Sequence, residues 1–229
     1  MDVVEIYHHL LSVHSPSNMI CLPTSTLLHL PDKGPSPPLT NTTQNLAQDN
    51  NFYSFNAPPS RIHPEIHAVD SYQNVLFSLL HFRLATGVYP QQISVVTHEF
   101  KRQRFMEWHF PALGLRPVLR SFTSAGVDDR GRAAKVRVIG INPPEEIAPL
   151  EGLIVGEEKS GIGLWRDDPY GVLGELAAKR KKRGWEHGME RGVFVGVGLE
   201  GVAEELVCWD RGSWFGELER LPWFGWFCS

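Results

Sequence analysis

The first 60 residues differ in composition from the rest of the chain, and this difference limits what the chain can fold into. They hold 8 of the 17 prolines, 1 of the 21 glycines and no arginine, whereas all 7 tryptophans come later. Proline lacks an amide donor and disfavours helix in the residue before it, so regular elements here have to be short. We expect an irregular Pro/Ser/Asn-rich segment over residues 1–60, with at most a helical turn near 44–52. A folded domain with an aromatic C-terminal extension should occupy residues 61–229.

Charge, hydropathy and cysteine content exclude several classes of protein. The 229 residues carry 22 basic and 26 acidic side chains, a net charge of −4 that gives no general case for binding nucleic acid. No uncharged apolar stretch reaches about 18 residues, so no membrane-spanning helix is expected. Cys21, Cys208 and Cys228 lack the spacing of a zinc site or a disulfide framework, and the chain starts with acidic residues, unlike a signal peptide. We expect a cytoplasmic location, and the sequence does not define the oligomeric state.

Hydrophobic spacing after residue 60 predicts alternating helices and strands. Apolar residues recur at helical spacing over 67–83, where Asp70 or Ser71 can cap the helix and Gly87 can end it. The β-branched run at 92–97 and the alternating run at 135–141 predict strands. Further helices are predicted at 98–108, 145–158, 170–183 and 200–209, and a loop at 120–134. This order of elements predicts an α/β fold in which neighbouring strands are parallel.

Such a fold places the candidate ligand-binding residues in two groups. Ligands of parallel sheets bind beyond the carboxyl ends of the strands. The residues that follow the predicted strands there are Thr97, His98 and Asn142. Asp70, Ser71 and Asn74 lie at the start of the first predicted helix, where unpaired amides attract anions. The same residues can simply cap the helix, so both interpretations stay open.

Three stretches of the sequence follow the motif order of a known family. Residues 65–74 read Glu-Ile-His-Ala-Val-Asp-Ser-Tyr-Gln-Asn, and residues 95–104 read Val-Val-Thr-His-Glu-Phe-Lys-Arg-Gln-Arg. They resemble the SanA/YdcF-like family, catalogued as domain of unknown function 218, which shows a Glu, a Ser/Asp-Thr-x-x-Asn helix start, and later a strand ending in Thr-Ser followed by Tyr-His and Arg. Residues 139–146 and 156–166 resemble the fungal branch of that family, so the resemblance covers about residues 61–225.

The resemblance implies a fold and a class of ligand. The fold would be a Rossmann-like three-layer sandwich with a mostly parallel sheet, and the ligand would be nucleotide-like or anionic. S-adenosylmethionine is a candidate, because a bacterial member is reported to bind it, whereas no reaction is established for the fungal branch. The positions that match the family's polar pattern are Glu65, Asp70, Ser71, Asn74, Thr97 and Arg104. With His98, Lys101 and Asn142 they form the predicted ligand-binding set.

The sequence departs from the family pattern at three places. His98 stands where Ser is usual, and Lys101 stands where His is usual. A lysine could replace a proton-transferring histidine near neutral pH only with a strongly lowered pKa. Nothing in residues 1–60 matches the first strand and the Gly-Gly loop with which the family opens. We therefore expect a shortened or mis-spliced chain whose sheet is incomplete at the N-terminus and leaves backbone edges unpaired.

Other features allow both a chemical and a structural interpretation. The basic run at 179–183 fits a nuclear import signal or a phosphate-binding patch, but we favour the solvated last turn of a helix. The histidines show no recognised metal-ligand spacing, since Pro64 interrupts the helix that His63 and His67 would share. The chain lacks the Gly-x-Ser-x-Gly turn of a serine hydrolase. No metal site is therefore expected.

Two functional hypotheses follow. The first is a small-molecule-binding α/β protein whose reaction, if it has one, the sequence does not name. The second is a non-enzymatic or degenerate family member that acts through a protein interaction, or a product without function. The helix-start residues with Thr97 and Arg104 favour the first hypothesis, whereas the missing Gly-Gly loop and Lys101 favour the second.

Overall fold

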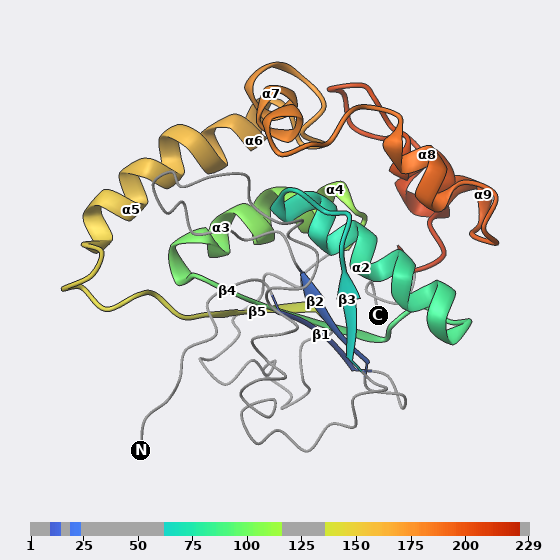
Figure 1. The fold of residues 1–229 in the computed structure, drawn as a ribbon, viewed down its shortest axis with the longest axis horizontal. Coiled ribbons are helices and arrows are strands. Elements are labelled where there is room, and N and C mark those ends of the chain that lie inside the picture. Colours follow the sequence, from blue (N-terminus) through green and yellow to red (C-terminus); the bar gives the residue numbers. More distant parts are fainter. Residues whose placement is uncertain (1–9, 15–18, 24–61, 116–135, 225–229) are drawn as a thin grey trace, which may run out of the picture.

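A five-stranded sheet lies at the base of the computed structural model, which describes residues 10–14, 19–23, 62–115 and 136–224 (Figure 1). The strands are β1 (Leu10–His14), β2 (Met19–Pro23), β3 (Ile62–Glu65), β4 (Gln92–Thr97) and β5 (Val136–Gly140). Their order across the sheet is β3-β2-β1-β4-β5. The two strands predicted from the sequence, β4 and β5, are confirmed and lie side by side.

The sheet is mixed, with one strand reversed. β1 is antiparallel to both of its neighbours, β2 and β4, whereas β2 pairs with β3 and β4 pairs with β5 in parallel. It follows that β2, β3, β4 and β5 all run in one direction. Pro23 pairs with Glu65 and Thr97 pairs with Gly140 in the ladder, so these four strands end at the same edge of the sheet. The candidate residues that follow the strands belong to this edge.

Two of the strands come from the segment expected to be irregular. β1 pairs along its whole length with β4, from Leu10 opposite Val96 to His14 opposite Gln92, so β4 has a neighbour on each side rather than an unpaired edge. Each of these strands is only five residues long, and although they pair with each other, their second partners, β4 and β3, lie far away in the sequence, which leaves little local signal. Proline is tolerated at the end of β2, where the ladder stops. The helical turn expected at 44–52, the loop at 120–134 and the last residues of the aromatic extension lie outside the described residues.

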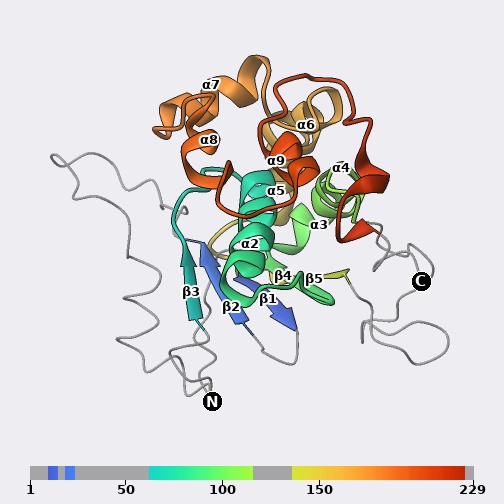
Figure 2. The ribbon, with the colours of Figure 1, turned by 90° about the vertical axis from the view of Figure 1, so that its right-hand side faces the viewer.

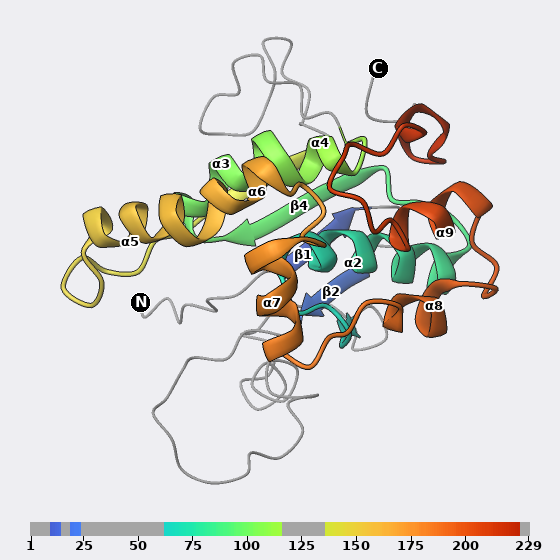
Figure 3. The same cartoon turned by 90° about the horizontal axis from the view of Figure 1, so that it is seen from above.

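The described helices cover one face of the sheet (Figures 1 and 2). Their bounds are α2 (Ser71–Thr86), the 3₁₀ turn η3 (Glu99–Lys101), α3 (Arg102–Arg104), the π-helical turn η4 (Phe105–His109), α4 (Phe110–Ala112), α5 (Leu150–Glu157), the π-helical turn η5 (Glu158–Ile162), α6 (Gly163–Asp167), α7 (Gly174–Lys182), α8 (Met189–Phe194), α9 (Gly201–Val207) and the 3₁₀ turn η6 (Leu218–Arg220). Viewed from above the helices, α6 to α9 surround α2 (Figure 3). The described residues therefore form a mixed α/β fold, and the three-layer sandwich expected from the family resemblance is not seen in them.

α2 is the central helix, and both of its ends agree with the sequence prediction. Asp70 caps its start, because the carboxylate Oδ1 accepts a hydrogen bond from the backbone N–H of Gln73 at 2.8 Å. Gly87 ends it with a φ of 78°, a left-handed conformation that suits glycine. Most of α2 is buried, including Val75 and Leu79, which have no exposed surface. It is buried on several sides because the sheet lies on one side of it and the outer helices lie on the other.

The helical segment after β4 changes geometry along its length. The helix predicted at 98–108 exists, but it runs as η3, α3, η4 and α4 in succession. Pro111 offers no N–H and its ring would clash with the carbonyl of Glu107, which explains the widened π-helical turn before it. Gly114, with a φ of 66°, then ends the segment. This path brings Lys101, Arg104 and His109 beside the start of α2.

Candidate functional site

Glu65 ends β3 and organises the turn that leads into α2. Its carboxylate accepts hydrogen bonds from the backbone N–H groups of His67 at 2.7 Å and Ala68 at 2.9 Å, one on each oxygen. Burial raises the pKa of Glu65 to about 7, because desolvation outweighs these two bonds, which favour the charged form. His81 on α2 lies 3.9 Å from the same carboxylate. Each Glu65 oxygen therefore already has a partner inside the protein.

Asp70 binds an arginine as well as capping α2. Its second oxygen, Oδ2, accepts a hydrogen bond from Arg180 Nε at 2.5 Å. Arg180 comes from α7 and also donates through Nη2 to the carbonyl of Tyr170 at 2.7 Å. Both charged side chains are 10 % exposed, and an unpaired charge at that depth would be costly. The capping interpretation of Asp70 is confirmed, and its carboxylate is fully engaged by Gln73 and Arg180.

Ser71 and Arg104 belong to one buried network. Ser71 Oγ lies 2.8 Å from His109 Nε2 and accepts a hydrogen bond from Arg104 Nη1 at 3.2 Å. Arg104 also binds Glu157 through both ends of its guanidinium, with Nε 2.6 Å from Oε1 and Nη2 on Oε2. A Cβ on Gly161 would come within 2.6 Å of Arg104 Nη2, so glycine makes room for this pair. The network anchors the start of α2 to η4 and to the end of α5.

His98 and Asn142 connect the ends of β4 and β5. The backbone N–H of Ile141 donates to the carbonyl of Thr97 at 2.9 Å, which extends the ladder by one pair. His98 Nδ1 donates to the carbonyl of Ile141 at 3.1 Å, and Asn142 Oδ1 accepts from the N–H of Phe100 at 3.1 Å. Burial lowers the pKa of His98, which favours its neutral form. Both side chains are therefore used to shape the turn beyond the strands.

Four cations gather around the start of α2, and we call Lys101, Arg104, Lys179 and Arg183 the basic cluster. Arg183, directly after α7, donates through Nη1 to the carbonyl of Val69 at 2.6 Å. Lys179 on α7 donates through Nζ to the carbonyl of Ser160 on η5 at 2.8 Å. Arg104 reaches the same helix start through Ser71. α7, α3 and η3 thus deliver positive charges to one region from different directions.

The charges of the basic cluster are only partly neutralised by the protein. Glu157 pairs with Arg104, but within the described part of the chain no carboxylate forms an ion pair with Lys101, Lys179 or Arg183. Burial and the nearby charges of Arg104 and Arg183 lower the pKa of Lys101 to about 8, against the opposing effect of Glu157. Burial, the largest cause, and the same two arginines also lower the pKa of Lys179, against the opposing charges of Glu175 and Glu157. Burial and mutual repulsion therefore make the charged forms of these lysines less favourable than they would be in water.

Two further candidate residues have buried polar atoms without a hydrogen-bond partner in the described part of the chain. Asn74 is 2 % exposed, and neither its Nδ2 nor its Oδ1 has a hydrogen-bond partner among the described residues. Thr97 Oγ1, at the end of β4, is also buried and has no hydrogen-bond partner among the described residues. Asn74 lies three residues after Ser71 and so on the same side of α2. Such groups usually cost about 1–3 kcal/mol each, and they mark places that a water or a ligand completes.

Three residues that take part in these contacts were not among the residues predicted from the sequence. Glu157 lies within the stretch 156–166 that carried the family resemblance, so a signal for it was present. Arg180 lies in the basic run interpreted as a solvated turn, and that interpretation is wrong for this residue, which is 8 % exposed and paired with Asp70. His109 is fully buried and had no signal, because a single histidine in a helical pattern is unremarkable.

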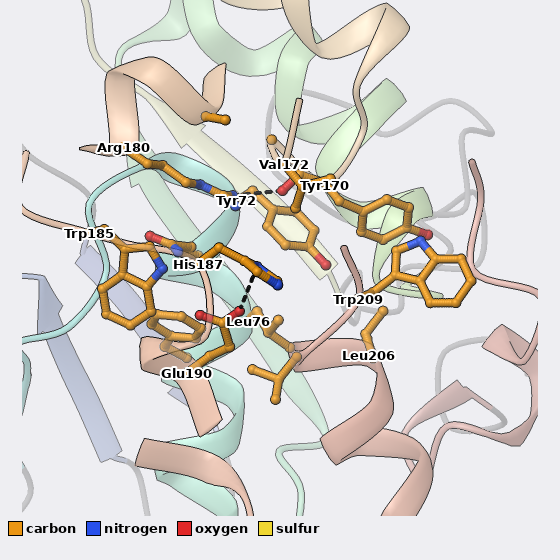
Figure 4. Close-up of a pocket in the computed structure, with 15 residues that line it drawn as sticks. Tyr72, Leu76, Tyr170, Val172, Arg180, Trp185, His187, Glu190, Leu206 and Trp209 are labelled. Atoms are coloured by element: carbon orange, nitrogen blue, oxygen red, sulfur yellow. Dashed lines mark hydrogen bonds and ion pairs between the residues drawn. The ribbon is translucent and has the colours of Figure 1, made fainter. Parts of the chain in front are cut away.

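A separate cavity lies between α2 and the outer helices (Figure 4). Its volume is about 60 Å³, which suits a few water molecules better than a nucleotide. Arg180 reaches it from α7, and His187 Nδ1 lies 3.3 Å from Glu190 Oε1 at its wall. None of the nine predicted ligand-binding residues lines it. The predicted site and this cavity are connected through Arg180 and Gln73, which both line the cavity and donate hydrogen bonds to Asp70.

Metal binding and membrane insertion gain no support from the described ranges. Within them, no three His, Cys, Asp or Glu side chains gather in a way that could hold a metal ion. Likewise, none of the helices described combines the length and the apolar character that crossing a bilayer requires.

Comparison with known proteins gives one distant relative. No family model matches the chain. The chain is similar to the uncharacterized protein YOR238W of Saccharomyces cerevisiae, with 24 % identity over 142 residues. The match covers 62 % of this chain and 42 % of the yeast protein, so it spans less than half of that relative's length. No solved structure matches.

Proposed function

We propose that this protein binds an anionic small molecule at the basic cluster. The observation that carries the proposal is the set of three cations, Lys101, Lys179 and Arg183, that form no ion pair with a carboxylate among the described residues. The nearby charges of Glu157 and Glu175 offset this positive charge only in part. They lie beside the positive end of a 16-residue helix dipole. An anion would offset charges that now repel one another, and so it would bind with a favourable electrostatic free energy.

The position of the cluster in the fold also supports the proposal. Lys101 and Arg104 lie just beyond the carboxyl end of β4, next to the edge at which four strands end. This is where ligands of α/β sheets bind. Lys179 and Arg183 close the region from the side of α7, and both remain partly accessible to solvent. A small anion can therefore reach the cluster from outside.

Membership of the SanA/YdcF-like family, with its Rossmann-like three-layer sandwich, remains part of the proposal. The motif order along residues 65–166 supports it, as does the parallel direction of four strands. The yeast relative is itself uncharacterised and adds no function. A cytoplasmic location is likewise proposed, and the free thiol of Cys208 agrees with it. The buried Arg180 disfavours an extended nuclear import signal at 179–183.

S-adenosylmethionine, the ligand implied by the family resemblance, does not fit these residues. Its sulfonium is a cation and would need a carboxylate or an aromatic face close by. Asp70 and Glu157 are both held by arginines, and the charge of Glu175 acts on Lys179. The aromatic ring of Phe100 already has the Lys101 ammonium over it, 5.6 Å from the ring centroid. A further positive charge would add to the repulsion within the basic cluster. No step of a reaction is therefore assigned to this cofactor.

A non-enzymatic role is the second candidate, and the internal pairing favours it. Asp70 with Arg180 and Glu157 with Arg104 form closed pairs, as expected of a scaffold. Ser71 and His109 are buried as well, so their close contact does not present a nucleophile to a substrate. A protein that only holds its helices together in this way would bind no small anion.

Thermal unfolding of the full chain distinguishes the two candidates. Phosphate and citrate should raise the midpoint above that in chloride at matched ionic strength. The double variant Lys101→Gln, Arg183→Gln should lose that difference. Lys182→Gln is the matched control, because Lys182 is an exposed cation at the end of α7 outside the cluster. Phosphate and citrate also stabilise folded proteins without binding, so the comparison between the two proteins decides. An equal rise of the midpoint in the parent chain and in the double variant would refute the binding proposal and favour the scaffold.

A further inference from the structure

We propose that the basic cluster is selective for a small molecule with a phosphate monoester group and discriminates against sulfonium compounds. This inference rests on the proposed function and narrows its ligand class. It differs from the expectation of S-adenosylmethionine, and it follows from the charges and donors that the described residues place around the start of α2.

The charge balance favours a dianion over a monoanion. Lys101, Lys179 and Arg183 are three positive charges without an ion-pair partner in the described residues. A single carboxylate would offset one of them. A phosphate monoester carries about −1.5 to −2 at neutral pH and would offset nearly two. The larger charge therefore removes more of the repulsion that the cluster contains.

The unused donors match a group with several acceptor oxygens. Among the described residues, Lys179 uses one of its three N–H donors, on the carbonyl of Ser160. Arg183 uses one of its five there, on the carbonyl of Val69. The donors approach from η3 and from α7, on different sides of the helix start. The three terminal oxygens of a phosphate monoester can accept from such separated donors, whereas a planar carboxylate has two oxygens.

A buried amide one helical turn after Ser71 gives a second and independent indication of a ligand. Asn74 is 2 % exposed and lies on the side of α2 that carries Ser71, to which Arg104 is bonded. Its Nδ2 and Oδ1 have no partners among the described residues. The described residues therefore do not complete the hydrogen bonding of this region by themselves. Neither Asn74 nor the cluster offers a carboxylate to a cationic ligand.

Calorimetric titration of the full chain at pH 7 and constant ionic strength tests the selectivity. The ligands are inorganic phosphate, adenosine monophosphate, adenosine and S-adenosylmethionine. We expect the two phosphate-bearing ligands to bind and to compete with each other. Adenosine and S-adenosylmethionine should bind at least tenfold more weakly, since each lost charged hydrogen bond corresponds to about a factor of ten.

Variants connect the selectivity to the cluster. Lys101→Gln should weaken the binding of phosphate about tenfold, whereas Lys182→Gln should leave it within twofold. Equal losses in both variants would overturn the assignment. S-adenosylmethionine could instead bind as tightly as the phosphate-bearing ligands, with its binding weakened by Lys101→Gln. That result would show a ligand site at the basic cluster and would overturn its selectivity for phosphate. If none of the four ligands binds, the proposed function itself fails.

Discussion

Replacement of Glu157 by glutamine removes the carboxylate that pairs with Arg104 and leaves the shape of the side chain nearly unchanged. The Arg104 and Glu157 side chains are 13 % and 8 % exposed, so the pair is largely removed from water. Removal of one partner of a buried pair costs about 3–5 kcal/mol because the other charge stays behind. Glutamine still accepts one hydrogen bond from the guanidinium, so we expect a loss of about 3 kcal/mol in the free energy of unfolding.

The same substitution should strengthen anion binding. Glu157 opposes the positive charges of Arg104 and Lys101, and its removal leaves the basic cluster one unit more positive. A gain of about 1 kcal/mol, or about fivefold in affinity, is expected for a charge several ångströms from the bound phosphate. Phosphate should therefore restore more stability to the variant than it adds to the parent chain. Stability and affinity thus change in opposite directions.

Urea unfolding at pH 7, with and without phosphate at matched ionic strength, measures both effects. Glu158→Gln is the neighbouring control, because Glu158 pairs with Arg166 at the surface, where both side chains are more than half exposed. Such a pair contributes about 0–1 kcal/mol. The reasoning is refuted if the two variants lose equal stability, or if phosphate stabilises Glu157→Gln no more than it stabilises the parent.

Three further predictions follow from other residues. Phosphate affinity should fall as the pH rises through about 8, where Lys101 loses its charge, and Lys101→Arg should keep the affinity to higher pH in the same calorimetric assay. Trp223 is fully buried and donates through Nε1 to the carbonyl of Leu113 at 2.7 Å, so Trp223→Ala should lower the free energy of unfolding by about 3–5 kcal/mol in urea, and a loss below about 1 kcal/mol would contradict this packing. The pKa of Glu65 is raised from 4.5 to about 7 in the folded chain, so the folded state binds the extra proton and stability falls as the pH rises from about 4.5 to 7. Glu65→Gln should flatten that part of the stability profile, and an unchanged slope would count against the raised pKa.

Local patterns in the sequence were sufficient for the elements whose signals are local. α2, β4 and β5 were predicted because helical spacing, a β-branched run and an alternating run each lie within one short window. Asp70 and Gly87 defined the ends of α2 through the same local chemistry of caps. β1 and β2 pair with each other locally, but they were missed because they are short and because their other partners, β4 and β3, lie far along the chain. The reversed direction of β1 also has no signature in its five residues.

The candidate site was predicted in its positions but not in its pairings. Asp70 and Arg180 are 110 residues apart, and Arg104 and Glu157 are 53 apart, so no spacing rule joins them. These ion pairs change the role expected for the predicted residues. Asp70 is a cap held by an arginine rather than a free ligand group. The positive charges that form no ion pair in the described residues belong to Lys101, Lys179 and Arg183. The sequence analysis favoured a solvated helix turn for the run 179–183 over a phosphate-binding patch.

Lys101 shows how one substitution in a family pattern can alter the chemistry of a site. A lysine could act in place of a proton-transferring histidine only with a strongly lowered pKa, and burial with Arg104 and Arg183 lowers the pKa of Lys101 to about 8. At pH 7 about a tenth of the free protein would then hold Lys101 neutral. A bound phosphate would raise that pKa again, since an adjacent anion favours the charged amine. Phosphate binding at Lys101 and proton abstraction by Lys101 therefore exclude each other.

Near pH 8, phosphate binding should take up a fraction of a proton, visible as a binding enthalpy that depends on the ionisation enthalpy of the buffer. Lys101→Arg should abolish that dependence, and an equal dependence in both proteins would assign the proton to another group.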